Sequence, residues 1–297
     1  MGVRLFATMG AFFFALPIFG AAAQSDGDLL ARGEYVLRAG ACIPCHTDFK
    51  GGGKELAGGR GLKTPFGLFY SPNITPDPET GIGRWTEAQF RAAVKQGVRP
   101  DGKHYYPVFP YPTYTRMTDG DLRALFAYLK SRPPVRQANK DHDLVPPFSW
   151  RSSLSFWKSL NFQPSDFQPD GRRPAAYNRG AYLATALAHC GECHTPRDWL
   201  GGLKESMALA GTRDGPEGEV APNITPHPET GIGKWSHSDL VTLLKSGQKP
   251  DFDNLQGVMQ ESVDHGFKYL TDADLAAIAT FVMEQNPIAN KVSRRSP

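Results

Sequence analysis

The residues of this sequence best suited to chemistry are its four cysteines, which occur in two copies of the pattern Cys-x-x-Cys-His. The copies contain Cys42, Cys45 and His46, and Cys190, Cys193 and His194. The pattern is typical of covalent c-type haem attachment, in which two thiols add to the haem vinyl groups and the histidine binds iron. The alternatives are a redox disulfide and a four-cysteine zinc site, but the histidine in both copies favours haem. The sequence therefore predicts two covalently bound haems, with His46 and His194 as proximal ligands.

Length and composition limit what surrounds these motifs. The chain has 297 residues, enough for one large or two ordinary domains. Its 31 glycines and 25 prolines favour many turns and loops. The formal net charge is only +3 and no basic stripe is present, which excludes a nucleic-acid-binding protein.

The first 23 residues have the character of a signal peptide. A short basic segment, Met1–Arg4, precedes an apolar run, Leu5–Phe19, and then the small residues Ala21–Ala23. The alternative is an uncleaved membrane anchor, but the run is short for a bilayer span. Bacteria attach c-type haem outside the cytoplasm, so we expect residues 1–23 to be removed and the protein to be periplasmic.

An internal repeat organises the rest of the chain. Three segments recur in the same order: Arg32–Val36 as Arg179–Leu183, Ser71–Trp85 as Ala221–Trp235, and Thr118–Leu122 as Thr271–Leu275. We therefore expect two duplicated domains, residues 24–130 and 174–297, joined by a connector of residues 131–173.

Each repeat has the same pattern of helix signals, and no stretch alternates convincingly as a strand. The expected helices are about 28–40 and 176–189 before the haem motifs, 87–96 and 238–245 after the repeated tryptophans, and a last helix capped by Thr118 or Thr271. The fold class expected is mainly α, with each unit wrapped around one haem.

The connector carries six large aromatic residues: Phe148, Trp150, Phe156, Trp157, Phe162 and Phe167. Exposed aromatic side chains are costly, so we expect an ordered strap packed across both units rather than a flexible linker. A partner-docking surface is the alternative.

The two units resemble the class I cytochrome c fold. The segments RGEYVLRAGACIPCHT, SPNITPDPETGIGRW, NRGAYLATALAHCGECHTPRDWLGG and APNITPHPETGIGKW further resemble the cytochrome c subunits of bacterial alcohol and gluconate dehydrogenases. The alcohol dehydrogenase subunits usually carry three haems and a C-terminal membrane segment. The resemblance therefore implies a soluble relative with two haems.

The same resemblance guides the choice of sixth iron ligands. In the second unit Met259 lies in what we expect to be the loop before the last helix, where such domains bring a methionine to the iron; the alternative is a core methionine. In the first unit, family members often have methionine where this chain has Phe109, so Met117 is the expected ligand. A five-coordinate haem, or ligation by another group such as His104, remains the alternative.

The repeated Pro-Asn-Ile-Thr segments and the tryptophans after them are expected to hold the haem propionates, because buried carboxylates need hydrogen-bond donors. The candidate donors are Asn73, Thr75 and Trp85 in the first unit and Asn223, Thr225 and Trp235 in the second. The alternative is a rigid turn with a core tryptophan. A carbonyl next to Pro196 is expected to support the proximal histidine of the second haem.

These features favour an electron-transfer protein rather than an enzyme. By resemblance, the electron donor is a periplasmic dehydrogenase and the acceptor a cytochrome, a quinone-linked complex or a terminal oxidase. Association with the membrane would then be peripheral, through a partner. The alternative function is a peroxidase-like dihaem enzyme, which requires an open position on the first haem iron.

Overall fold

The computed structural model describes residues 1–2 and 25–293, so most of the expected signal peptide lies outside the described residues. The described part is mainly helical, as predicted. The first half contains α1 (Asp26–Ala39), α2 (Cys42–His46), α3 (Glu87–Gln96), α4 (Tyr111–Tyr114) and α5 (Asp119–Lys130). The connector contributes α6 (Ser153–Asn161). The second half contains α7 (Ala175–Tyr182), α8 (Cys190–His194), α9 (His237–Ser246), α10 (Gly257–His265) and α11 (Asp272–Met283), with short 3-10 turns between them.

In each half the first and last helices pack together through a glycine. A Cβ on Gly33 of α1 would overlap the carbonyl oxygen of Ala124 in α5, and a Cβ on Gly180 of α7 would overlap that of Ala277 in α11. The repeated Arg-Gly-x-Tyr motif therefore brings the two helices of each half into close contact.

The last helices begin where their caps predict. The Thr118 hydroxyl accepts the backbone N–H of Asp121 at 3.2 Å, and Thr271 accepts that of Asp274 at the same distance. The helix before the second haem motif differs from expectation. After α7 the chain forms one π-helical segment, Leu183–Leu187, and its side chains are largely buried.

Three short strands are present, although no stretch of the sequence alternates convincingly as a strand. β1 (Gly61–Thr64) and β2 (Gly67–Tyr70) form an antiparallel hairpin, and β3 (Asp143–Leu144) from the connector adds a third strand beside β2. Four-residue and two-residue strands are too short to show an alternating pattern in the sequence.

The connector is ordered and contacts both halves. The Nε1 of Trp157 donates to the Leu200 carbonyl of the second half at 2.9 Å, and Asp166 forms an ion pair with Lys95 of the first half. However, Trp150 and Phe156 are 61% and 63% exposed. The strap expected from the sequence therefore buries only part of its aromatic surface.

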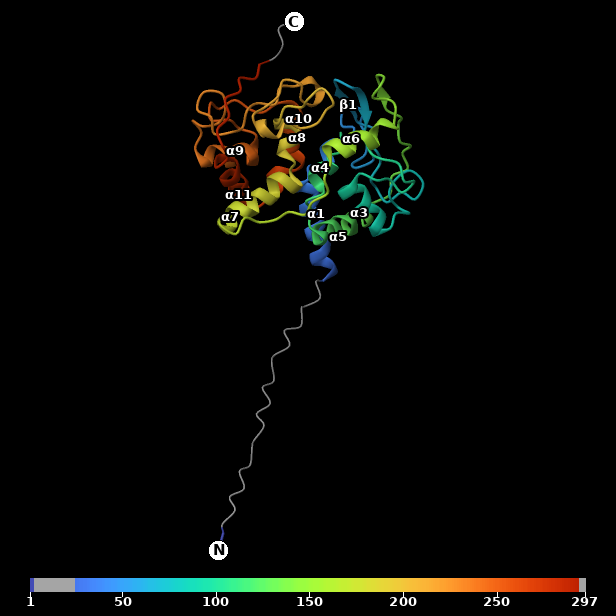
Figure 1. Cartoon of the computed structure of the whole chain (residues 1–297). Coiled ribbons are helices and arrows are strands. Elements are labelled where there is room, and N and C mark those ends of the chain that lie inside the picture. The colour runs from blue at the N-terminus through green and yellow to red at the C-terminus, as the bar shows by residue number, and fades with distance from the viewer. Residues whose placement is uncertain (3–24, 294–297) are drawn as a thin grey trace.

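The two halves lie against each other, and Figure 1 shows the second half, yellow to red, beside the first, blue to green. One contiguous cluster of buried side chains extends through both, from Val36 and Leu125 in the first to Leu187 and Val282 in the second. This shared core places the haem motifs of the two halves near the same interface.

Candidate haem centres

Each Cys-x-x-Cys-His motif forms a short helix of its own, and the backbone turns in the same way just before each of them. Ala41, before α2, has a φ of 46°, and His189, before α8, has a φ of 44°. Both residues are in the left-handed region, which turns the chain sharply between the long helix and the motif. The two motifs therefore have the same backbone geometry, as expected of a duplicated attachment site.

The four thiols are free, with no disulfide between them. Burial raises the pKa of Cys42 to about 12 and that of Cys190 to about 11, so the thiols are neutral near pH 7. In the part of the chain that the structure describes, no group of three or more His, Cys, Asp and Glu side chains is arranged to hold a metal ion. Each motif therefore offers two neutral thiols next to one histidine.

The histidines of both motifs are fixed by one hydrogen bond each. The Nδ1 of His46 lies 2.8 Å from the carbonyl oxygen of Pro72, and the Nδ1 of His194 lies 2.8 Å from that of Pro222. A carbonyl can only accept, so Nδ1 carries the proton and Nε2 presents its lone pair. Burial lowers the pKa of both histidines, which keeps the imidazoles neutral. A neutral imidazole with a free Nε2 is what a proximal haem ligand requires.

The carbonyls that orient the histidines are not those expected. The oxygen of Pro196 accepts the backbone N–H of Lys204 instead of supporting His194. The supporting residues, Pro72 and Pro222, begin the repeated Pro-Asn-Ile-Thr motif. Its near-identity in both repeats was the signal, but the prediction gave the motif a different role.

The asparagine and threonine side chains of this motif form hydrogen bonds with the backbone of the segment that follows the last helix of the same unit. The Nδ2 of Asn73 donates to the Val135 carbonyl at 2.7 Å, and the Thr75 hydroxyl accepts the Val135 N–H at 3.1 Å. In the second unit Asn223 and Thr225 hold Ile288 at the same two distances. The motif therefore fastens the segment after the last helix to the loop that supports the histidine.

These hydrogen bonds give Asn73, Thr75, Asn223 and Thr225 the rigid-turn role, and a propionate contact for the same four residues stays a prediction. Trp85 and Trp235 are half-buried and pack against the core cluster. A propionate contact for the two tryptophans stays a prediction.

The residues of both motifs fit a covalently attached haem. Two neutral thiols and one neutral, oriented imidazole lie on a single short helix in each unit. Cys42, Cys45 and His46 would hold one haem, and Cys190, Cys193 and His194 the other.

The proposed sixth ligand of the second unit, Met259, lies on a helix. A loop is expected there from the sequence, but residues Gly257–His265 form α10, and Met259 is a half-buried residue of its first turn. The sequence of α10 is too polar and too short to show helical periodicity.

The two units share one register through the segment that contains Met259. The backbone N–H of Tyr105 donates to Gly97 at 2.9 Å, and that of Leu255 donates to Gly247 at 2.8 Å. Counting four residues on from Tyr105 and Leu255 gives Phe109 and Met259. Both of these side chains pack, partly buried, against the core cluster.

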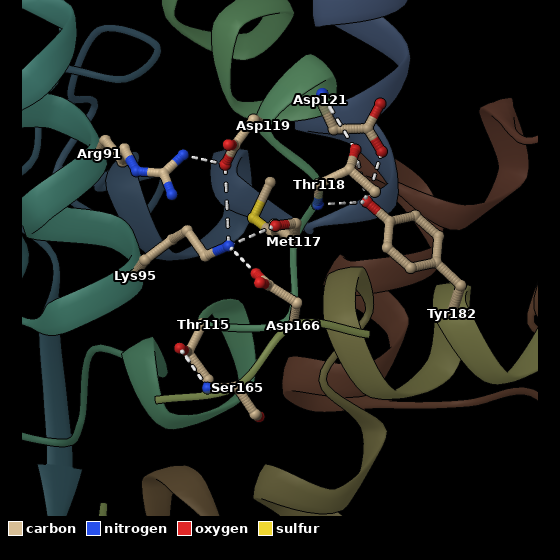
Figure 2. A network of polar contacts seen from close by, with 10 residues as sticks. All are labelled: Arg91, Lys95, Thr115, Met117, Thr118, Asp119, Asp121, Ser165, Asp166 and Tyr182. Carbon is tan, nitrogen blue, oxygen red and sulfur yellow. Dashed lines mark hydrogen bonds and ion pairs between the residues drawn. The ribbon is translucent and has the colours of Figure 1, made fainter. Parts of the chain in front are cut away.

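Met117 has a different counterpart in the second unit. The Nζ of Lys95 donates to the Met117 carbonyl at 3.0 Å, and that of Lys245 donates to the Leu270 carbonyl at 3.4 Å. Met117 and Leu270 each precede a capping threonine, and each is 2% exposed. Met117 therefore occupies the place of Leu270, not that of Met259; Figure 2 shows it beside Lys95 and Thr118.

Charged side chains connect the haem motifs across the interface. The guanidinium of Arg60 donates to the Pro44 carbonyl of the first motif at 2.7 Å and forms an ion pair with Glu261 of α10. Burial and the neighbouring thiol of Cys45 are the two largest causes that raise the pKa of Cys193 to about 12. Arg60 therefore joins the first haem motif to α10 of the second half.

A tyrosine from α4 also lies between the two motifs. Tyr114 is buried; its hydroxyl donates to the Gly40 carbonyl at 3.0 Å, and its ring packs edge-on against His189 with centroids 5.6 Å apart. Gly40 lies two residues before the first motif helix, and His189 lies directly before the second. Sequence patterns give no signal for this contact.

Comparison with known proteins agrees with this geometry. Residues 30–133 match the family model described as cytochrome c. A "Diheme cytochrome c-type" protein of Cereibacter sphaeroides is 41% identical over 87% of this chain and 89% of its own length. An alcohol dehydrogenase (quinone) cytochrome c subunit of Gluconacetobacter polyoxogenes is 41% identical over 96% of this chain. A fructose dehydrogenase cytochrome subunit of Gluconobacter japonicus is 42% identical over 85% of it.

The structure and these matches define a c-type cytochrome with covalently bound haem, and the chain belongs to the cytochrome c family. The chain spans 62% of the length of the alcohol dehydrogenase subunit and 52% of that of the fructose dehydrogenase subunit. Two of these relatives are named as cytochrome subunits and the third as a dihaem cytochrome, which confirms the prediction of an electron-transfer protein. Among the described residues, no helix has the length and apolar character needed to cross a membrane.

Proposed function

We propose that this protein is a periplasmic cytochrome with two c-type haems that relays electrons from a dehydrogenase toward the respiratory chain. The observation that carries the proposal is the duplicated histidine geometry. In both units a neutral imidazole is fixed through Nδ1 by a proline carbonyl, which leaves Nε2 directed for iron. A relative of similar length, the protein of Cereibacter sphaeroides, is named a dihaem cytochrome.

The chain's own residues set how each haem is held. The haem supplies one-electron redox chemistry at its iron. The Pro72 and Pro222 carbonyls fix the tautomer and orientation of His46 and His194, and a hydrogen-bonded Nδ1–H makes an imidazole more basic. We assign Met259 as the sixth ligand of the second haem, where a thioether favours the ferrous state and raises the potential.

The contact between the units supports transfer from one haem to the other. Tyr114 donates to the carbonyl of Gly40 before the first motif and packs against His189 before the second. Attachment segments bridged by one side chain shorten the path between two haem edges. We take residues 24–130 and 174–297 as the two haem-binding units, with residues 131–173 as the connector.

Localisation and partner follow from the sequence and the relatives. We assign residues 1–23 as a leader that exports the chain to the periplasm, where the haems are attached. Because several relatives are named as subunits of alcohol, fructose and gluconate dehydrogenases, we propose a separate dehydrogenase as the electron donor. The acceptor would be a cytochrome, a quinone-linked complex or a terminal oxidase.

An exposed apolar area supports a protein partner. Phe156 and Leu160 are one turn apart on α6, and Trp199 is 81% exposed in the loop after the second haem motif. Trp157 of the same helix donates to the carbonyl of Leu200, so this loop and α6 adjoin. Exposed apolar patches mark interaction sites, and this one is near the second haem motif.

Expression in a bacterium that attaches c-type haem tests the proposal. The purified protein should retain two haems per chain after acid–acetone extraction, and a Cys42→Ala/Cys45→Ala variant should retain one. Stopped-flow mixing with a reduced periplasmic dehydrogenase should reduce both haems, with no turnover of the dehydrogenase's substrate by the cytochrome alone. A chain without covalent haem, or with unchanged haem content in the double variant, would contradict the proposal.

A further inference from the structure

We propose that the iron of the first unit has no methionine ligand and keeps a sixth coordination position open to a small, uncharged ligand. The proposal rests on the haem assignment above and concerns one residue position in each unit. It follows from the register that the two units share, together with the place of Met117.

The register is fixed on both sides of the position in question. Before it, a bridge pairs Val98 with His104 in the first unit and Gln248 with Asn254 in the second. After it, the capping residues Thr118 and Thr271 begin the last helices. Between the two markers the second unit has three more residues than the first, so each side must be matched on its own.

Matched from the first marker, the position of Met259 falls on Phe109. The bridges and the hydrogen bonds of Tyr105 and Leu255 carry the same register to within four residues of Phe109 and Met259. Phenylalanine has no atom that can bind iron. If Met259 is the thioether ligand of the second haem, the equivalent side chain of the first unit cannot be one.

Matched from the second marker, Met117 falls on Leu270. Both carbonyls accept a lysine ammonium, and both side chains are almost fully buried. Lys95 is itself buried and pairs with Asp166 of the connector, while the N–H of the next residue, Thr118, bonds to the Tyr182 hydroxyl of the second unit (Figure 2). This segment is therefore held from three directions in the place that a leucine fills in the other unit.

His104 is engaged elsewhere. Its Nδ1 lies 3.2 Å from the Nζ of Lys158, which also donates to the Gln96 carbonyl, and the His104 carbonyl accepts from Arg151. Its counterpart in the second unit is the exposed Asn254. These contacts hold His104 against the connector rather than at the position of Phe109.

The surroundings of Phe109 select the kind of ligand. Its ring contacts those of Tyr105 and Tyr114, with centroids 5.4 Å and 5.9 Å apart. Burial raises the pKa of Tyr105 to about 12, so this ring is neutral near pH 7. An aromatic surrounding of this kind favours a diatomic gas over an anion, because burying an anion costs its hydration.

The test uses carbon monoxide as the probe and spectroscopy of the loaded protein as the readout. The native protein, Phe109→Met, Met117→Leu and Met259→Leu are compared, each with its covalent haem content measured first. We expect the reduced native protein to bind carbon monoxide at half of its haems and to show the near-infrared methionine–iron band of one haem. Met117→Leu should leave both signals unchanged.

The other two variants give opposite results. Phe109→Met should abolish carbon monoxide binding and double the methionine band, while Met259→Leu should remove the band and let both haems bind carbon monoxide. Loss of a methionine band in Met117→Leu would overturn the proposal. A native protein that binds no carbon monoxide would also overturn it, and that result does not depend on whether Met117→Leu folds. Fewer than two haems in the native protein would instead refute the proposed function.

Discussion

Tyr35 of the first unit and Tyr182 of the second each donate a hydrogen bond across the interface to an aspartate of the other unit. The Tyr35 hydroxyl donates to Asp274 at 2.5 Å, and the Tyr182 hydroxyl donates to Asp121 at 2.5 Å. Arg179 and Arg32 then pair with those two carboxylates from within their own units. The repeated arginine, tyrosine and aspartate thus form two equivalent clusters that join the units.

Removing either hydroxyl should weaken the interface. We expect Tyr35→Phe and Tyr182→Phe each to lower the free energy of unfolding by about 1–2 kcal/mol, because a partly buried carboxylate loses a donor. Denaturant titration followed by haem absorbance and circular dichroism measures this. Tyr70→Phe, within β2 of the first unit, is the control. Equal losses in all three variants would show that the two tyrosines have no special role.

Adding a side chain at Gly33 or Gly180 should destabilise the protein, because two helices are in close contact at each position. Gly33→Ala and Gly180→Ala should each cost about 1–3 kcal/mol, because the new Cβ meets a backbone carbonyl that cannot move without the helix. Gly120→Ala is the matched control, because a Cβ there has no atom within 4 Å. That change should be neutral or stabilising by up to about 1 kcal/mol. Thermal unfolding that ranks Gly120→Ala with the other two would contradict the packing.

The interaction between Arg60 and Glu261 should contribute measurably to the free energy of unfolding. Arg60→Met should destabilise the protein by about 3 kcal/mol, because it leaves Glu261 unpaired and frees the Pro44 carbonyl. The double variant Arg60→Met/Glu261→Leu should recover part of that loss, since Glu261 no longer lacks a partner and only the more distant Glu217 does. A double-mutant cycle measures the coupling. Strictly additive effects would mean that the two side chains do not interact.

Stability should fall in acid through Asp274. Burial opposes its ionised form, but the hydrogen bonds from Arg179 and Tyr35 outweigh burial and lower the pKa of Asp274. A group with a lowered folded pKa stabilises the protein above its unfolded pKa of 3.8, and this stabilisation is lost as the pH falls through the folded pKa. Asp274→Asn should lack this component. Unfolding curves from pH 7 to pH 3 that run parallel in both proteins would contradict the prediction.

The exposed apolar area should act on the rate of electron exchange and not on stability. Trp199→Ser should slow reduction by the donor dehydrogenase several-fold while leaving the haem potentials and the unfolding midpoint unchanged. Phe252→Ser is the control, since Phe252 is equally exposed but belongs to the loop between α9 and α10. Matching rates in both variants would place the partner elsewhere.

The sequence predicted the features that depend on local pattern. The haem motifs, the capped last helices and the repeat all rest on residues close together in the chain. The strands and α10 escaped because each is too short or too polar for periodicity to show. The roles of Pro72 and Asn73 escaped for another reason: their partners, His46 and Val135, are 26 and 62 residues away, and spacing cannot identify such partners.

Met117 as the sixth ligand of the first haem stays a prediction from the sequence, and the register of the repeat argues against it. The sequence favours Met117 because it is the methionine nearest the expected position in the first unit. The hydrogen bonds from Lys95 to Met117 and from Lys245 to Leu270 show that these two positions are equivalent in the two units, which the amino-acid sequence alone does not show. Hydrogen bonds to the backbone locate equivalent positions more reliably than side-chain identity does when one unit has an insertion.

The two tyrosine–aspartate contacts have the pattern of an isologous interface, in which residue i of one copy contacts residue j of the other and j contacts i. Two separate copies of a single unit would present both halves of this contact to each other. The fused chain therefore keeps the interface of a symmetric homodimer, and the connector replaces association between two molecules with association inside one.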